Sequence, residues 1–371
     1  MVRFDRRSLK MRPLSGRTNK LRIDEISVLP NSVMEPLPDK LQIRLRAAAE
    51  SIRRARESGK PVILTYGAHL VKNGLAPVVI GLIKDGWVTH LATNGAGSIH
   101  DWEFAYLGES SEDVQVNTAR GEFGTWEETG RFINLAVAIG GLSDLGYGAS
   151  VGKMIADDSL EIPTCDELRS AIRERSNADS PGEFLGALSD ALSLIADFHL
   201  PPGKMIVPHP FKEFSIQCAA YQLGIPLTIH PGIGYDIIYT HPMNSGGAIG
   251  RASVRDFTSY AEAVGKLGGG GVHISVGTAV MGPMIFEKSL SMANNVSIQK
   301  TGSPLADYTL LVVDIQDGGD WDWSAGEPPM DNPAYYLRFC KSFYRMGGRL
   351  DYLCLDNRSF LLGLYSELSG S

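Results

Sequence analysis

The stretch that most constrains the fold is residues 61–108, PVILTYGAHLVKNGLAPVVIGLIKDGWVTHLATNGAGSIHDWEFAYLG. It opens with an apolar run, residues 61–66, whose length and β-branched content are typical of a strand buried on both faces. Residues 73–86 then carry apolar side chains at helical spacing and end in a glycine, which commonly stops a helix. A second apolar run at 88–92 leads into the small residues 93–97. This order predicts a βαβ unit, whose right-handed crossover brings both following turns to the carboxyl edge of a parallel sheet.

The second half of the chain repeats this alternation of strand and helix. Further apolar runs predict strands that each end in a turn of small or polar residues: 225–229, 272–276, 308–313 and 352–355. Helical spacing predicts helices at 211–223, 248–267, 283–294, 335–344 and 360–368 in this half, and another at 39–58, before the first strand. We therefore expect an α/β protein with a Rossmann-like, mostly parallel sheet and helices on both of its faces.

Residues 110–203 depart from this pattern. Their periodicity is mostly helical, and the segment is too long for a plain crossover connection. We expect it to form a helical insertion within a single α/β domain that covers residues 39–371. Residues 1–38 are interrupted by prolines and predict a partly irregular N-terminal arm.

Composition and charge narrow the classes of function. The net charge is −7, and no Lys/Arg cluster occurs beyond the first 22 residues, so no nucleic-acid partner is expected. No run of about 18 apolar residues occurs, and the N-terminus lacks the apolar segment of a secretory signal, so no membrane partner is expected. The cysteines show neither metal-site spacing nor a CxxC pair, which predicts buried thiols in a reducing cytoplasm: Cys165, Cys218, Cys340 and Cys354.

Five segments, in order over roughly residues 60–370, carry a family resemblance. They are GAHLVKNGL with THLATNGAGSIHD, IPLTIHPGIGYDIIYTHP, VHISVGTAVMGPMIFEKSL, ADYTLLVVDIQDGGDWDWSAGE and YLCLDNRSFLLGL. Together these segments resemble the strands and turns of the deoxyhypusine synthase family. The resemblance implies NAD lying across the carboxyl edge of the sheet, and a homotetramer or dimer with sites at subunit interfaces. It also implies transfer of an aminobutyl group from a polyamine to an amine acceptor, with a lysine that captures an imine.

Residue by residue, the resemblance implies a set of cofactor contacts on the turns after the strands. An Asp at a strand end suits a ribose, because its carboxylate accepts hydrogen bonds from both hydroxyls of the diol. The implied cofactor-binding residues are Thr93, Asn94, Gly95, Gly97, Asp236, Gly277, Thr278, Asp320, Ser324 and Asp356.

The catalytic positions depart from the family pattern. The family's lysine falls near residues 337–341, where counting along the chain leaves both Arg338 and Lys341 open, and we expect Lys341. A lysine can form an imine, whereas an arginine stays protonated and cannot. Where the family has an acidic pair after its first glycine turn, this chain has Ile99-His100 before Asp101. We expect His100 to be a second catalytic residue, because imidazole transfers protons near neutral pH.

The segment DGGDWDWSAGE combines carboxylates with tryptophans, a composition that suits a cationic, partly apolar ligand. An exposed acidic loop with one tryptophan packed inward is the alternative. The substrate is expected to be a small polyamine-like cation, contacted by His69, Asp101, Asp322, Trp323 and Glu327.

Two other functions stay open at this point. The chain could keep a nucleotide pocket without transferase chemistry, as a binding or regulatory protein. A metal-assisted hydrolase could instead use His230, Asp236 and His241. The spacing of these three residues does not match a known zinc site, so no metal is predicted.

Overall fold

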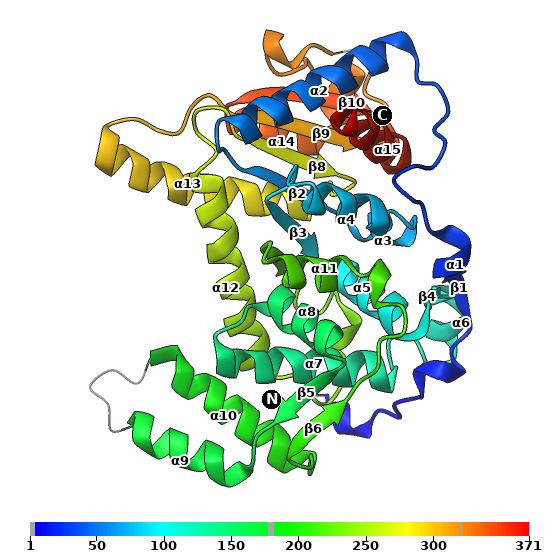
Figure 1. The fold of residues 1–371 in the computed structure, drawn as a ribbon, viewed down its shortest axis with the longest axis vertical. Coiled ribbons are helices and arrows are strands. Elements are labelled where there is room, and N and C mark those ends of the chain that lie inside the picture. The colour runs from blue at the N-terminus through cyan, green and yellow to red at the C-terminus, as the bar shows by residue number, and fades with distance from the viewer. Residues whose placement is uncertain (1–3, 177–181, 320, 371) are drawn as a thin grey trace. The chain divides into compact units, whose positions relative to one another are not determined.

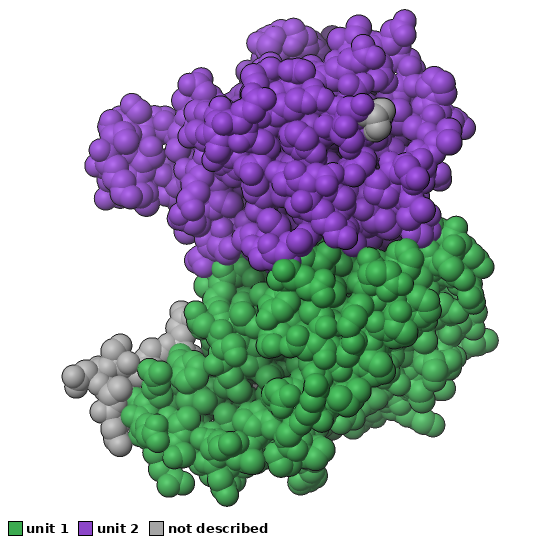
Figure 2. All heavy atoms as spheres, in the orientation of Figure 1, with its two compact units in different colours: residues 1–26, 98–222, 231–256 green, residues 27–97, 223–230, 257–371 purple. Residues whose placement is uncertain are grey.

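The computed structural model describes residues 4–176, 182–319 and 321–370 of the 371-residue chain. These residues form two compact units, shown in different colours in Figure 2. Unit 1 takes residues 1–26, 98–222 and 231–256, and unit 2 takes residues 27–97, 223–230 and 257–371.

Unit 2 is built on a six-stranded sheet in which every pair of neighbours is parallel (Figure 1). Its spatial order is β10-β9-β8-β2-β3-β7, which is 3-2-1-4-5-6 from the opposite edge when the strands are numbered along the chain. This is the strand order of Rossmann dinucleotide-binding folds. The predicted fold class is confirmed. The strands are β2 (Val62–Tyr66), β3 (His90–Asn94), β7 (Leu227–His230), β8 (Val272–Val276), β9 (Thr309–Asp314) and β10 (Arg349–Cys354).

Helices cover both faces of this sheet (Figure 1). One face is covered by α2 (Asp39–Glu57), α4 (Ala76–Lys84) and α15 (Asn357–Ser369), after the short α3 (Ala68–Lys72). The other is covered by the end of α12 (Gly246–Gly265), α13 (Met281–Thr301) and α14 (Arg338–Arg345). The β-branched strand residues lie between these two helical layers, which is why β2 and β8 are buried along their whole length.

Unit 1 is mostly helical and carries two small antiparallel sheets. Its sheets pair β1 (Asn19–Arg22) with β4 (Glu109–Glu112), and β5 (Ser159–Ile162) with β6 (Gly203–Ile206). Its helices include most of α5 (Gly95–Leu107), α6 (Val114–Ala119), α7 (Glu127–Gly140), α8 (Tyr147–Asp157), α9 (Cys165–Ser176), α10 (Gly182–Asp197) and α11 (Ile216–Leu223). Shorter helical turns in the chain are α1 (Ile23–Ile26) and the 3₁₀ turns Arg6–Ser8, Leu14–Gly16, Gly141–Ser143, Lys212–Phe214, Ile237–Tyr239, Trp323–Ala325 and Pro333–Tyr336.

Some segments differ from the sequence expectation. Residues 110–203 lie within unit 1 and are mostly helical, but they also contribute strands that helical periodicity did not indicate. The expected irregular arm contains β1, because its residues pair with β4. Cys218 and Cys340 are buried as expected, while Cys165 and Cys354 are half-buried, and all four thiols are free.

In the described part of the chain, no single helix has the length and apolar composition to cross a membrane. One pair, Glu127–Ser143 with Tyr147–Asp157, would reach that length and composition together, but it bends by 104°.

Candidate functional site

The order of the sheet in unit 2 reverses between β2 and β8, and the two turns after these strands lie in contact. The Gly67 N–H donates to the Val276 carbonyl at 3.1 Å. A Cβ placed on Gly67 would lie 2.1 Å from the Gly277 carbonyl oxygen, closer than atoms can approach. Gly277 itself is exposed and has φ +56°, a conformation that favours glycine. The chain therefore keeps side chains away from this point and leaves backbone groups at the edge of the sheet.

The next turn joins β3 directly to helix α5. The Asn94 side-chain oxygen accepts a hydrogen bond from the Gly97 N–H at 2.8 Å, which caps the first turn of the helix. Thr93 is buried and donates to the Tyr66 carbonyl at 2.8 Å, which fixes the end of β3 to the end of β2. A Cβ on Gly97 would lie 2.3 Å from Thr93 Oγ1, so glycine is required there. Four predicted cofactor residues, including Gly95 at the start of α5, thus form one compact turn.

Two further helices start near the ends of β8 and β10. Thr278 is buried, and its hydroxyl accepts from the Gly282 N–H at 3.0 Å in the first turn of α13. Asp356 is exposed and caps α15 by accepting from the Ser359 N–H at 2.9 Å. Each of these polar residues holds a helix N-terminus at this edge, where the helix dipole favours an anion.

The acidic loop after β9 splits into an inward and an outward part. Trp323 is 4% exposed and packs with Tyr344 at 6.0 Å between ring centroids. Its indole belongs to the apolar core of unit 2, and its role as a substrate contact stays a prediction. Asp322 is exposed and accepts hydrogen bonds from the backbone N–H and the hydroxyl of Ser324, at 2.9 and 2.7 Å. The predicted cofactor residue Asp320 lies outside the described residues.

Lys341 lies one turn into α14 and is largely covered. Its ammonium nitrogen is 3.4 Å from the centroid of the Tyr335 ring, and its side chain is 12% exposed. Glu327 Oε2 lies 4.0 Å from the same nitrogen. Arg345 pairs with both oxygens of Glu327, and this guanidinium holds the pKa of Glu327 below its usual value. Glu327 therefore has two cationic neighbours, Lys341 and Arg345. Arg338, the other candidate for the catalytic position, is exposed at the start of α14.

Three predicted site residues belong to unit 1. Asp101 is 2% exposed, and its carboxylate accepts hydrogen bonds from the Ser215 hydroxyl, the Ile216 and Gln217 backbone and the Gln217 side chain. This carboxylate holds the start of α11, and its role as a substrate ligand stays a prediction. Asp236 accepts from the Gly232 N–H at 3.1 Å, and burial raises its pKa to about 6. His100 contacts the Ser110 hydroxyl. His69 of unit 2 is exposed in α3, directly after the Gly67 turn.

The hydrolase alternative needs a metal site. Across the described parts of the chain, no three His, Cys, Asp or Glu side chains are arranged to hold a metal ion. In unit 1, both ring nitrogens of His241 have partners. Nε2 lies 3.2 Å from Glu127 Oε2, and Nδ1 accepts a hydrogen bond from the Met243 N–H. His230 of unit 2 instead bonds to the Thr228 hydroxyl at 3.1 Å and packs on the Tyr260 ring.

Sequence reasoning missed three contributors to these arrangements. Tyr335 contacts the Lys341 ammonium, and both residues fall in the helix expected at 335–344. Side chains six residues apart do not face each other on a helix, so the sequence did not predict this contact. Glu103 and Ser110 are the other two contributors. Both lie close to His100 in the sequence as well as in the structure. The i, i+3 spacing of His100 and Glu103 could have indicated that they are neighbours on a helix. That inference required α5, which was not predicted from the sequence.

The chain was compared with known proteins. No family model and no curated protein matches it. It is similar to the structure of ArgZ, an arginine dihydrolase from the ornithine-ammonia cycle in cyanobacteria (14% identity, 89% of this chain and 33% of that chain, TM-score 0.39). It is also similar to AgrE in a ternary complex with ornithine and NAD⁺ (12%, 91% and 34%, 0.42). A third similar structure is a conserved putative LOR/SDH protein from Methanococcus maripaludis S2 (13%, 92% and 74%, 0.43). The chain spans about a third of the length of the first two proteins, and at these scores the likeness does not extend to ligand or activity.

Proposed function

We propose that unit 2 binds NAD at the carboxyl edge of its sheet and carries out deoxyhypusine-synthase-like chemistry. In this proposal, an aminobutyl-type group passes from a polyamine to an amine acceptor through Lys341. When bound, NAD would supply the hydride acceptor for oxidation of the amine. The observation that carries the proposal is the Rossmann strand order together with the contacting glycine turns at its point of reversal.

The residues at this point fit a dinucleotide. Ligands of open α/β sheets bind outside the carboxyl ends of the strands, where the order reverses. A Cβ on Gly67 would strike the Gly277 carbonyl oxygen, so glycine is needed for the two turns to meet at this edge. Gly95 and Gly97 would let a dinucleotide come close to the backbone at the start of α5, and the exposed Asp356 would offer a carboxylate for a ribose.

Lys341 belongs to the half of the sheet that suits the reacting end of the cofactor. In a Rossmann sheet, the first three strands in the chain carry the adenosine half, so the last three face the nicotinamide half. Lys341, Tyr335 and the acidic loop all lie in the connection between β9 and β10, the last two strands. The chain order therefore favours the nicotinamide half of unit 2 for the lysine and the acidic loop.

The side-chain environment favours Lys341 over Arg338 as the residue that captures an imine. The Lys341 amine is covered by an aromatic face, whereas Arg338 is exposed and cannot lose its proton. The π face of Tyr335, which now contacts the ammonium, would equally attract a cationic substrate. We further propose a polyamine-like substrate and, following the family resemblance, a homo-oligomeric assembly.

The test is covalent trapping. The protein is incubated with NAD and spermidine, reduced with borohydride and digested, and its peptides are weighed by mass spectrometry. We expect one added aminobutyl group on Lys341, lost in Lys341→Ala and retained in the matched control Arg338→Ala. Absence of the adduct in the wild-type protein, while NAD still binds, would favour a nucleotide-binding or regulatory protein instead.

A further inference from the structure

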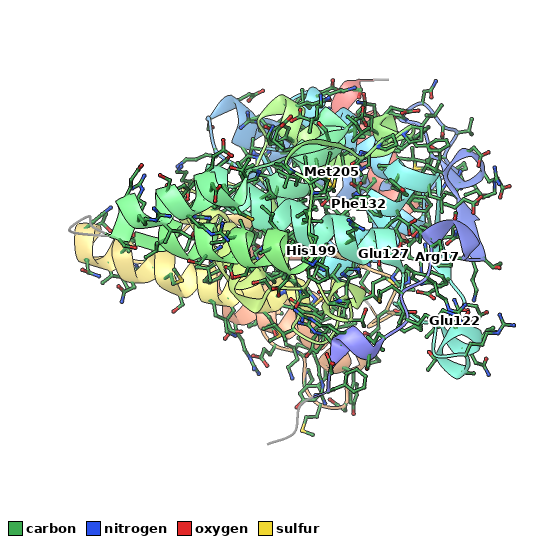
Figure 3. The ribbon with its side chains drawn as sticks, turned by 90° about the horizontal axis from the view of Figure 1, so that it is seen from below. Arg17, Glu122, Glu127, Phe132, His199 and Met205 are labelled. Atoms are coloured by element: carbon green, nitrogen blue, oxygen red, sulfur yellow. The ribbon has the colours of Figure 1, made fainter. Side chains whose placement is uncertain are left out.

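A buried chain of polar groups in unit 1 ends on His100. Arg17, labelled in Figure 3, comes from the N-terminal segment and pairs with both oxygens of Glu103 at 2.8 and 2.6 Å. Both side chains are buried, at 2% and 1% exposure. The Ser110 hydroxyl donates to Glu103 Oε2 at 2.5 Å, and His100 Nδ1 lies 2.7 Å from the same hydroxyl oxygen.

We propose that Arg17, Glu103 and Ser110 hold His100 as its Nδ1–H tautomer, so that Nε2 is the proton-accepting nitrogen. Ser110 and Glu103 are then positioning residues for a proton-transfer histidine. The assignment of His100 as a base for amine chemistry rests on the proposed function, but the tautomer does not.

The direction of the hydrogen bonds follows from the charge on Glu103. Burial alone would favour the neutral acid, but the Arg17 guanidinium, together with the Ser110 hydroxyl and His100, brings the pKa of Glu103 below its usual value. An ionised carboxylate only accepts hydrogen bonds, so the Ser110 hydroxyl proton points to Glu103. The Ser110 oxygen can then only accept from His100, which places a proton on Nδ1. Thr129 adds a second donor to Glu103, at 2.9 Å to the other oxygen.

The backbone fixes this geometry from two sides. His100 and Glu103 lie three residues apart on α5, which puts them on the same side of the helix. Ser110 belongs to β4 and pairs with Leu21 of β1. The next residue, Ser111, has φ +73°, a strained conformation for a residue other than glycine. Such strain persists only where surrounding contacts determine the backbone, as the pairing of β1 with β4 does here.

This arrangement suits acceptance of a proton. An ammonium group at Nε2 would lose its proton to that nitrogen, one N–H bond breaking as the other forms. The resulting imidazolium would donate through Nδ1 to Ser110, which is polarised by the Glu103 carboxylate. The same logic orients the base in hydrolase triads, in which a third group fixes the tautomer of the imidazole.

The test is nuclear magnetic resonance of the full-length protein labelled with ¹⁵N-histidine, recorded without NAD or polyamine at an alkaline pH where the imidazole is neutral. His100→Gln assigns the signal. We expect a protonated Nδ1 and an unprotonated Nε2 at His100 in the wild-type protein. Ser110→Ala should lose this preference, whereas Thr129→Val, which leaves the His100–Ser110 contact in place, should retain it.

A wild-type His100 protonated at Nε2 would overturn the proposal, and that spectrum decides even where a variant does not fold. An unchanged tautomer in folded Ser110→Ala would overturn it as well. Because no cofactor or substrate is present, failure of the transferase proposal would leave this result intact.

Discussion

Two hydrogen-bonded clusters, each around one histidine, show opposite arrangements: His273 of unit 2 is fully buried, and His100 of unit 1 is half-buried. In unit 2, His273 bonds only to neutral hydroxyls, those of Tyr260 at 2.9 Å and Thr65 at 3.0 Å. In unit 1, His100 reaches an ionised carboxylate through Ser110. Burial lowers the pKa of His273 to about 3, so it stays neutral and serves packing. A buried imidazole is prepared to take a proton only where a compensating charge lies within its hydrogen-bond chain.

The largest expected effect on stability comes from breaking the buried ion pair of Arg17 with Glu103, on which the His100 cluster depends. Arg17→Met leaves the Glu103 carboxylate buried without its partner, and we expect a loss of about 3–5 kcal/mol of stability. The exposed pair of Arg22 with Asp24 is the matched control, and Arg22→Met should change stability far less, because water screens an exposed ion pair. Urea unfolding monitored by circular dichroism measures both variants. Equal effects would show that the Glu103 pair is not the buried charge described here.

The two clusters should also differ in the cost of losing one hydroxyl. Ser110→Ala removes a hydrogen bond to an ionised group and should cost about 2–3 kcal/mol. Thr65→Val removes a neutral hydrogen bond to His273, which keeps its bond to Tyr260, and should cost about 1 kcal/mol. Urea midpoints of the two variants make the comparison. A larger cost for Thr65→Val would reverse the contrast.

Acid should destabilise the neutral histidine cluster. Burial lowers the pKa of His90 and His273 to about 3 and of His230 to about 4, whereas an unfolded histidine titrates near 6.5. The unfolded chain therefore binds more protons below pH 6.5, and stability falls as pH falls towards these values. Each histidine should contribute a loss of about 2 kcal/mol between pH 6.5 and 5. His273→Gln should reduce the loss by that amount, and the exposed His69→Gln should not.

The smallest expected effect concerns the turn between β3 and α5. Asn94→Ala removes the cap of α5 and should cost about 1 kcal/mol, while Asn94→Ser should retain most of the stability because serine also caps helices. Thermal unfolding of the two variants tests this. A full loss with serine would mean that Asn94 acts through some contact other than the cap.

The alternation of apolar runs was enough to predict the sheet of unit 2. Its strands are short, β-branched and bounded by small residues, so period and length identified them without tertiary information. Some strands and one helix of unit 1 were not predicted, because their sequence patterns are weak. The four-residue strands β1 and β5 are stabilised by pairing and not by their own pattern. Helix α5 begins at Gly95, inside what reads as a glycine turn.

The site residues were predictable in position but not in role. Turns after parallel strands share an edge by topology, so Gly67, Asn94 and Gly277 could be placed from sequence. Whether a polar side chain faces a ligand or a helix N-terminus depends on local geometry. Asp101 turned out to hold α11, and Trp323 to fill the core. Composition cannot distinguish these roles, because a cap and a ligand contact require the same oxygen atoms.

The measurement that most directly tests the central claim is the thermal unfolding midpoint with saturating NAD, with and without spermidine. A ligand that binds only the folded state at about 100 times its dissociation constant adds about 2.7 kcal/mol, enough for a visible shift. The account predicts a rise with NAD that grows when spermidine is added. A rise with NAD that spermidine does not increase would support NAD binding and contradict a polyamine substrate. No rise with either ligand would contradict a dinucleotide site at the β2–β8 edge.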